Sequence, residues 1–269
     1  TYNVENYVLT DRMTEAGYRK GYPKSEAQKA ALRTVIRGLG ADVLVLQEMG
    51  PRPFLHELQR DLKAEGIEYP FAVLGEAADT ERHLAVLSRR PLVRTVTHRD
   101  LEFTYLGQRE RVKRGMLEVT LEFGGRELTL FGVHLKSRFT DRADDPLSAV
   151  RRAGEATVVR DRILTRFPQP AGARFLVLGD CNDFRSSRPM ALLQKRGKTE
   201  IVELLDASDA RGETWTHAFR REDSYSRVDH ILISAALKHS VRGGSATIYD
   251  GPGVMSASDH RPVFVVLDQ

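Results

Sequence analysis

The stretch from residue 174 to residue 184, Arg-Phe-Leu-Val-Leu-Gly-Asp-Cys-Asn-Asp-Phe, constrains the fold more than any other part of the chain. Its apolar first half predicts a strand buried on both faces, and a glycine ends that run. Asp180, Asn182 and Asp183 follow directly. Polar groups at the carboxyl end of a buried strand lie where open α/β sheets bind their ligands. Asp and Asn also favour turns, so this stretch alone leaves a ligand site and a simple turn equally open.

The same arrangement, a predicted strand with polar side chains at one end, recurs along the chain. The polar groups are Asn3, Glu5 and Asn6 in strand 1–8, Glu48 at the end of strand 41–48, His134 at the end of strand 127–134, Asp229 at the start of strand 228–234, and Asp259 and His260 before strand 263–267. Buried carboxylates must be paired or hold a metal, so we expect these groups to share one site. Their oxygen-rich composition favours Mg²⁺ or Mn²⁺ over structural zinc.

Composition and missing motifs narrow the class of protein. With 41% hydrophobic and 29% charged residues, the chain resembles ordinary soluble globular proteins. No apolar run approaches the roughly 20 residues of a membrane-spanning helix. The net charge of +4 favours acidic partners only mildly. The sequence has no P-loop, no Gly-x-Ser-x-Gly elbow and no His-Glu-x-x-His helix, and its single cysteine, Cys181, excludes an intrachain disulfide.

The order of predicted elements indicates a single domain over residues 1–269. Apolar periodicity predicts helices over 24–39, 53–65, 145–167 and 189–195, and the third is expected to bury Leu147 and Val150. Further strands are predicted over 85–88, 92–97, 115–122 and 241–248. No linker or shift in composition divides the chain, which suits two stacked sheets covered by helices.

The start of the sequence leaves the compartment open. The chain begins at Thr1, without a methionine, and enters strand-like sequence almost at once. Removal of a signal peptide would imply export, for example to a periplasm, whereas a cloning boundary would imply nothing about location. We expect a monomer.

Six motifs in order carry a resemblance to a known family. They are Asn3-Val-Glu5-Asn6, Gln47-Glu48, Gly132-Val-His134-Leu-Lys136, Gly179-Asp180-Cys-Asn182-Asp183, Arg227-Val-Asp229-His-Ile and Ser258-Asp259-His260-Arg-Pro. Together they resemble the endonuclease/exonuclease/phosphatase superfamily of deoxyribonuclease-like, metal-dependent phosphoesterases, over nearly the whole chain. The resemblance implies a four-layer α/β/β/α sandwich in which helices flank two packed mixed β-sheets, with the site at one edge of the sheets.

The resemblance also implies a role for each motif residue. Glu48 is the principal metal ligand, with Asn3, Glu5 and Asp259 beside the metal. Asp180 orients or deprotonates the attacking water, Asn182 and His260 hold the phosphate, and Asp229 orients His260. His134 matches a second histidine of the deoxyribonuclease-like members. Asn6, Arg114 and Lys136 are expected to bind substrate, although Asn6 as a structural residue and Arg114 as a surface residue stay open.

These roles predict a Mg²⁺-dependent phosphodiester hydrolase, with Mn²⁺ or Ca²⁺ as alternatives and one or two ions. A nuclease acting on DNA by metal-assisted in-line attack of water is the first hypothesis. A small-molecule or lipid phosphodiesterase or phosphatase is the second. Within it, the polar segments 76–82 and 139–145 argue weakly against a sphingomyelinase, because neither offers a membrane-inserting hairpin. A catalytically inactive binding module is the alternative from another class.

Overall fold

The computed structural model describes residues 1–14 and 16–269. Its helices are α1 (Glu26–Leu39), α2 (Arg52–Ala64), α3 (Ala149–Arg166), α4 (Arg188–Gln194) and α5 (Val254–Ala257), with 3₁₀ turns η1 (Pro170–Gly172), η2 (Ala235–Ser240) and η3 (Arg242–Gly244). The strands of the two large sheets are β1 (Tyr2–Tyr7), β4 (Val43–Met49), β5 (Phe71–Gly75), β6 (His83–Ser88), β7 (Leu92–His98), β10 (Met116–Phe123), β11 (Arg126–His134), β12 (Phe175–Asp180), β15 (Glu203–Leu204) and β19 (Asp229–Ile233). The remaining strands are β2 (Thr10–Thr14), β3 (Gly17–Tyr22), β8 (Glu102–Tyr105), β9 (Gln108–Arg111), β13 (Lys195–Arg196), β14 (Thr199–Glu200), β16 (Ala207–Ser208), β17 (His217–Phe219), β18 (Ser224–Ser226), β20 (Ala246–Ile248) and β21 (Val263–Phe264).

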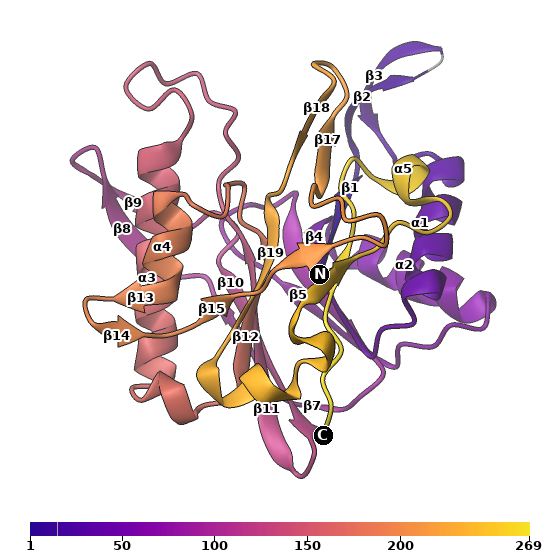
Figure 1. The fold of residues 1–269 in the computed structure, drawn as a ribbon. Coiled ribbons are helices and arrows are strands. Elements are labelled where there is room, and N and C mark those ends of the chain that lie inside the picture. Colours follow the sequence, from indigo (N-terminus) through magenta and orange to yellow (C-terminus); the bar gives the residue numbers. More distant parts are fainter. Residues whose placement is uncertain (15) are drawn as a thin grey trace.

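Two mixed sheets form the centre of the molecule. One has the order β1-β4-β6-β5 and the other the order β15-β19-β12-β11-β10-β7. Strands β1 and β4 run parallel, as do β11 and β12, whereas β19 runs antiparallel to β12. Helices α1 and α2 lie outside the first sheet, and α3 and α4 lie outside the second (Figure 1). The predicted four-layer sandwich is therefore confirmed.

Three apolar layers hold this sandwich together. The first packs α1 and α2 against one sheet, the second fills the space between the sheets, and the third packs α3 and α4 against the other sheet. The middle layer joins Val45 and Val86 of the first sheet to Leu117 and Leu178 of the second. Strands covered on both faces read as continuous apolar runs, which is why 175–178 carries no polar residue.

Local signals in the sequence set the ends of α1. Ser25 accepts a hydrogen bond from the backbone of Gln28, while Gln28 reaches back to the amide of Ser25, which completes a capping box. Gly40 adopts the left-handed conformation that closes the helix. The prediction for this helix is confirmed to within two residues.

The structure corrects two other predictions. Helix α3 begins at Ala149 rather than at Asp145, and the side chains of Leu147 and Val150 are 59% and 52% exposed, so the prediction that they are buried was wrong. The side chain of Asp145 accepts hydrogen bonds from the amides of Val150 and Arg151 and so caps the first turn of α3. Residues 145–148 form a separate turn before the helix. The strand predicted over 241–248 is reduced to β20, because η3 occupies its first half.

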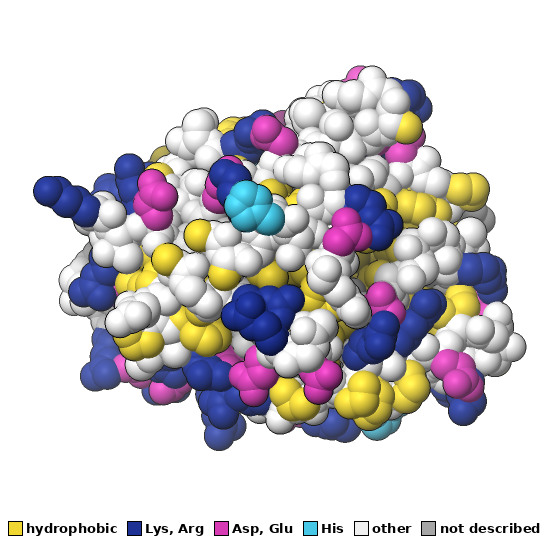
Figure 2. Space-filling model, turned by 60° about the horizontal axis from the view of Figure 1, so that its bottom comes forward, with side chains coloured by type: hydrophobic (Ala, Val, Ile, Leu, Met, Phe, Trp, Pro, Cys, Tyr) yellow, Lys and Arg dark blue, Asp and Glu magenta, His cyan; other side chains and the backbone are white. Residues whose placement is uncertain are grey.

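The described residues form four further hairpins that the sequence did not reveal: β2–β3, β8–β9, β13–β14 and β17–β18. The hairpins β2–β3 and β17–β18 rise from the same end of the molecule (Figure 1). The opposite end carries interspersed basic, acidic and apolar side chains (Figure 2). None of the helices in the described residues is long and apolar enough to cross a membrane.

Gly179 is expected to be essential for folding. Its φ of +151° lies in a region that favours glycine, and a methyl group there would lie 1.9 Å from the carbonyl oxygen of Val133 in the adjacent strand. Since both atoms belong to one parallel ladder, neither can move away. We expect Gly179→Ala to lower the free energy of unfolding by about 3 kcal/mol or more. Urea denaturation measures this loss.

Gly172→Ala is the matched control, because a methyl group at Gly172 meets no atom of the described residues within 4 Å. This change is expected to alter the free energy of unfolding by less than about 1 kcal/mol. Equal stability of the two variants would contradict the close approach of β11 and β12.

Candidate active site

The register of the second sheet places three of the predicted site residues side by side. His134 pairs with Asp180 across the parallel strands β11 and β12, and Asp180 pairs with Asp229 across the antiparallel strands β12 and β19. In the first sheet, the parallel strands β1 and β4 bring Asn3 opposite Gln47, next to Glu48. The chain direction therefore gathers residues that are far apart in the sequence at one edge of the sandwich.

Backbone strain marks the same edge. Glu5, Asn6, Glu48 and Asn182 all have left-handed φ angles between 48° and 61°. Non-glycine residues adopt this conformation rarely, and such residues concentrate at functional sites where surrounding contacts enforce it. At Glu5, Asn6 and Glu48 this conformation coincides with a shift in the register between β1 and β4, after which the two strands pair again at Tyr7 and Met49.

Asp180 lies at the centre of the cluster. Its carboxylate accepts hydrogen bonds from the Asn182 amide (2.8 Å), from Asn182 Nδ2 (3.2 Å) and from Asn3 Nδ2 (3.0 Å). Its Oδ2 lies 3.5 Å from His134 Nε2 and 3.9 Å from His260 Nε2. Burial, and then the neighbouring carboxylate of Asp229, raise the pKa of Asp180 to about 7. Such a carboxyl group can take up and release a proton near neutral pH.

His260 and Asp229 form a buried pair. His260 Nδ1 donates a hydrogen bond of 2.8 Å to Asp229 Oδ2, and this bond leaves Nε2 facing Asp180. Burial opposes the charged form of His260, but Asp229, and then Asp180 and Asp259, outweigh it and raise its pKa well above the usual range. His260 is therefore a cation at neutral pH, with its free N–H directed into the cluster.

His134 has the opposite character. Burial, and then the positive charge of Arg114, lower its pKa well below the usual range, so the ring is neutral. Its Nε2 faces Asp180 and lies 4.0 Å from Glu48 Oε1, while its buried Nδ1 has no hydrogen-bond partner among the described residues. A neutral imidazole can donate one hydrogen bond without adding charge.

The donor set fits a divalent cation. Glu48 Oε2 accepts a hydrogen bond from the Asn6 amide, which orients the carboxylate, and its Oε1 faces the cluster. Among the described residues, no Lys or Arg nitrogen lies within 4.0 Å of the Glu48, Asp180 or Asp229 carboxylates, and Asp229 Oδ1 is buried without a partner. The carboxylates of the cluster thus outnumber their cationic partners, and the amide side chain of Asn3 lies beside them. Such an oxygen-rich set of ligands suits Mg²⁺ or Mn²⁺.

Asn3, Glu5 and Asp259 surround the inner cluster. Asn3 Oδ1 accepts from the Glu5 amide at 3.0 Å, and Glu5 lies 3.4 Å from Lys24 Nζ. Burial, and then Asp259, raise the pKa of Glu5. Although burial opposes it, a hydrogen bond from His217 and the charge of His260 lower the pKa of Asp259 to about 2.

The three predicted substrate-binding residues lie in different places. Asn6 Oδ1 accepts a hydrogen bond of 2.6 Å from Arg82 Nε, close to Glu48. Arg114 pairs with Asp79 at 3.1 Å, and Lys136 Nζ donates to Ser137. The structure thus joins Asn6 to the cluster and engages Arg114 and Lys136 with other groups; their roles in binding stay predictions.

Sequence reasoning missed His217. It lies on β17, its ring centroid is 4.5 Å from that of His260, and its Nε2 is 3.6 Å from Asp259 Oδ2. Thr216, which precedes it, accepts hydrogen bonds from the amides of Val228 and Asp229 through its hydroxyl group. Neither residue belongs to a motif, and the bridge between His217 and His260 and the hydrogen bonds of Thr216 bring them to the site.

The sequence profile of the Endonuclease/Exonuclease/phosphatase family matches residues 1–260. The chain belongs to this family. The resemblance on which the sequence analysis depended is therefore confirmed, and family membership indicates a hydrolase that acts on phosphoester bonds. A comparison with curated protein sequences gives no match.

Solved structures of similar fold cover almost the entire chain. Sphingomyelinase C from Streptomyces griseocarneus has a TM-score of 0.66 at 19% identity, covering 99% of this chain and 97% of that one. Beta toxin from Staphylococcus aureus, as a double mutant with bound magnesium ions, has a TM-score of 0.67 at 14% identity, covering 99% and 98%. The human nocturnin catalytic domain with bound sulfate has a TM-score of 0.62 at 16% identity, covering 90% and 88%. At these identities, the likeness establishes the fold of this family member.

Proposed function

We propose that the protein hydrolyses phosphodiesters with the help of a divalent cation. The observation that carries this proposal is the meeting of a buried carboxylate, Asp180, with a cationic imidazole, His260, whose other nitrogen is held by Asp229. A base for water and a donor for phosphate oxygens are the two groups that the chemistry needs from protein side chains.

Each side chain of the cluster has a part in the reaction. Asp180 takes a proton from the attacking water as the water oxygen bonds to phosphorus; the bond from phosphorus to the leaving oxygen breaks, and that oxygen takes a proton from solvent. His260 and Asn182 donate hydrogen bonds to the non-bridging oxygens, where negative charge develops, and the neutral ring of His134 adds a third donor. Asp229 keeps His260 in one tautomer and orientation. Glu48 and Asn3 would hold the cation, with Glu5 and Asp259 beside it; when bound, the cation neutralises charge on the phosphate.

Nucleic acid, and DNA first, is the proposed substrate class. Several cationic side chains surround the strained residues of β1: Arg82 bonds Asn6, Arg12 donates to the backbone of Asn6, and Lys24 lies beside Glu5. Cations placed around the site suit a polyanion, whose flanking phosphates lie on both sides of the scissile one.

A lipid phosphodiester is the second candidate. The hairpins β2–β3 and β17–β18, which rise from the end of the molecule that bears the site, expose Met13, Tyr18, Phe219 and Tyr225 (Figure 1). Segments 76–82 and 139–145, whose polarity argued weakly against a sphingomyelinase, are not part of these hairpins. Similarity in fold to a sphingomyelinase supports testing this candidate.

An activity panel tests both. Purified protein is incubated with Mg²⁺ or with EDTA on single- and double-stranded DNA, RNA, bis-p-nitrophenyl phosphate, p-nitrophenyl phosphate and sphingomyelin vesicles. We expect Mg²⁺-dependent cleavage of nucleic acid and of the diester, and slow turnover of the monoester. Cleavage of sphingomyelin alone would replace the first substrate class by the second. Inactivity on every diester would overturn the proposed function.

A further inference from the structure

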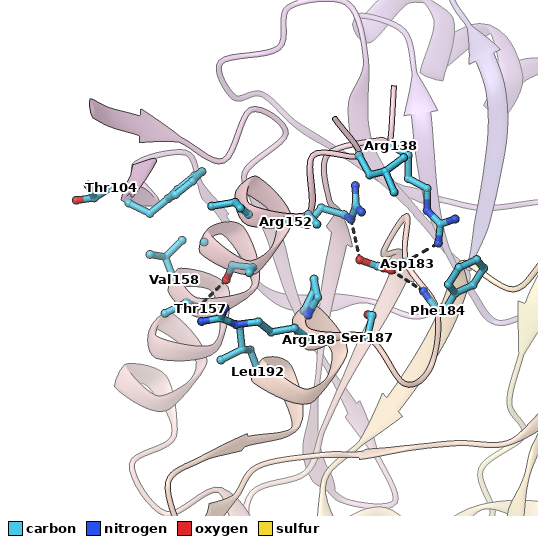
Figure 3. Close-up of a pocket in the computed structure, with 17 residues that line it drawn as sticks. Thr104, Arg138, Arg152, Thr157, Val158, Asp183, Phe184, Ser187, Arg188 and Leu192 are labelled. Carbon is cyan, nitrogen blue, oxygen red and sulfur yellow. Dashed lines mark hydrogen bonds and ion pairs between the residues drawn. The ribbon is translucent and has the colours of Figure 1, made fainter. Parts of the chain in front are cut away.

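A groove of about 770 Å³ lies beside the active site, between α3, α4, β8 and the loop that follows β12 (Figure 3). This volume lies within the range of sites that bind small organic molecules. The groove begins at Asp183, which directly follows Asn182 of the phosphate-binding cluster. Asp183 therefore joins the lining of the groove to the proposed phosphate-binding residue Asn182 along the chain.

Two arginines, Arg138 and Arg152, line the mouth of the groove, which is its end next to Asp183. Figure 3 shows Arg138 and Arg152 directed toward Asp183 from different elements. Arg152 Nε donates a hydrogen bond of 2.9 Å to Asp183 and is almost fully buried, whereas Arg138 lies 3.5 Å from Asp183 and is partly exposed. The Arg138 guanidinium also stacks 3.8 Å from the ring centroid of Phe184. The mouth therefore offers an aromatic face and a cation together.

The walls combine apolar surface with an excess of positive charge. Leu147 and Val150, which the sequence predicted to be buried, line the groove and are exposed, and Phe184 is 47% exposed. The charged lining consists of Arg138, Arg152, Arg188 and the single carboxylate Asp183. Ser187, also in the lining, has a buried hydroxyl oxygen without a hydrogen-bond partner in the described residues. The groove thus presents apolar surface and one arginine, Arg188, that has no ion-pair partner among the described residues.

We propose that this groove binds single-stranded nucleic acid on one side of the scissile phosphate, with a base against Phe184 and the next phosphate near Arg188. Unpaired bases stack on aromatic side chains, and arginines neutralise the phosphates between them. An acyl chain would bury the apolar wall but would leave Arg188, which has no ion-pair partner among the described residues, without an anion. The bases of a duplex are stacked on one another and cannot present a free face to Phe184.

The inference deepens the proposed function and rests on it, so the experiment separates the two. Turnover of bis-p-nitrophenyl phosphate with Mg²⁺ tests the chemistry, because this small diester does not need the groove. Binding of a fluorescein-labelled oligodeoxythymidylate of about twelve nucleotides, followed by anisotropy in EDTA, tests the groove. The same titration with oligouridylate and with anionic phosphatidylglycerol vesicles identifies the class of ligand.

Phe184→Ala and Arg188→Glu are the test variants. Each is expected to raise the Kd for the oligonucleotide about tenfold or more, and the double variant further. The matched controls are Phe71→Ala and Arg126→Glu, which change exposed residues on β5 and β11, outside the lining of the groove. The controls are expected to change Kd less than twofold. Thermal unfolding establishes that each variant is folded, and Arg188→Glu, at an exposed position, keeps the test decisive if Phe184→Ala fails to fold.

Three results would overturn the inference. The first is an oligonucleotide affinity that neither variant changes in a protein that hydrolyses the small diester. The second is a loss of vesicle binding without a loss of oligonucleotide binding. The third is failure of the wild-type protein to hydrolyse any diester, which removes the proposed function as well.

Discussion

Replacing Asp180 by Asn is expected to lower kcat on any diester by roughly 10³-fold or more, because the variant has no group that can take the proton of the attacking water. The wild-type rate should rise with pH through the neutral range, since the pKa of Asp180 is raised to about 7. A bound cation favours the ionised form and moves this rise to lower pH. The variant should lack the rise altogether. Stopped assays over pH 5 to 9, at several Mg²⁺ concentrations, measure both effects.

The same substitution is expected to leave the metal-free protein at least as stable as the wild type. The pKa of Asp180 is higher in the folded protein than in the unfolded chain, so ionisation destabilises the fold above about pH 4, increasingly up to about pH 7. Asparagine cannot ionise and avoids this loss. Urea denaturation in EDTA should therefore give equal stability at pH 4 and an advantage for the variant at pH 8.

Asp206→Asn is the control, because Asp206 is an exposed carboxylate that pairs with Arg185 away from the cluster. It should preserve the wild-type rate and the wild-type pH profile. An Asp180→Asn protein with more than a tenth of the wild-type kcat would refute the assignment of the base.

The sequence could predict that the polar side chains meet at one site, because each apolar run marks a strand and the polar residue marks one end of it. The apolar runs before Glu48, His134 and Asp180 identify buried strands, and parallel neighbours place their carboxyl ends together. The pairing of Asp180 with Asp229 follows from one further fact, the antiparallel course of β19. Polar residues at the ends of buried strands therefore indicate a common site, even though each short motif alone does not.

Contacts that depend on short, irregular segments could not be predicted. His217 reaches the site through a three-residue strand that pairs with β18 and forms a bridge to His260. Periodicity also misplaced the start of α3, since it counts apolar residues and ignores the cap that Asp145 provides. The error had a consequence, because Leu147 and Val150 line the groove beside the site instead of the core.

The burial of charged residues in the third apolar layer could not be predicted from the sequence either. Arg152 is almost fully buried and bonds Asp183, more than thirty residues away along the chain. An amphipathic helix normally directs arginines to solvent, and here the distant carboxylate and the carbonyl oxygen of Lys136 compensate the burial of the guanidinium. The sequence alone therefore does not show that Arg152 is buried.

Replacing Glu48 by Gln is expected to weaken binding of Mn²⁺ or Mg²⁺ by about 100-fold or more and to lower kcat/KM by a similar factor at limiting cation. The variant removes one negative charge from the oxygen ligands, and hard cations bind carboxylates far more tightly than amides. Its remaining carbonyl oxygen can still accept the hydrogen bond that the Asn6 amide donates to Glu48. The left-handed turn at this position should therefore persist, and the protein should remain folded.

Electron paramagnetic resonance of added Mn²⁺ counts free ions directly, so the loss of binding can be read without substrate. Glu76→Gln is the control, since Glu76 is exposed and pairs with Arg52 on the surface. It should bind Mn²⁺ as the wild type does. High Mg²⁺ should restore part of the activity of Glu48→Gln, because the base and His260 are intact in this variant, whereas no concentration should restore Asp180→Asn. Equal Mn²⁺ affinity in Glu48→Gln and the wild type would remove Glu48 from the cation site and leave Glu5 and Asp259 as its remaining carboxylates.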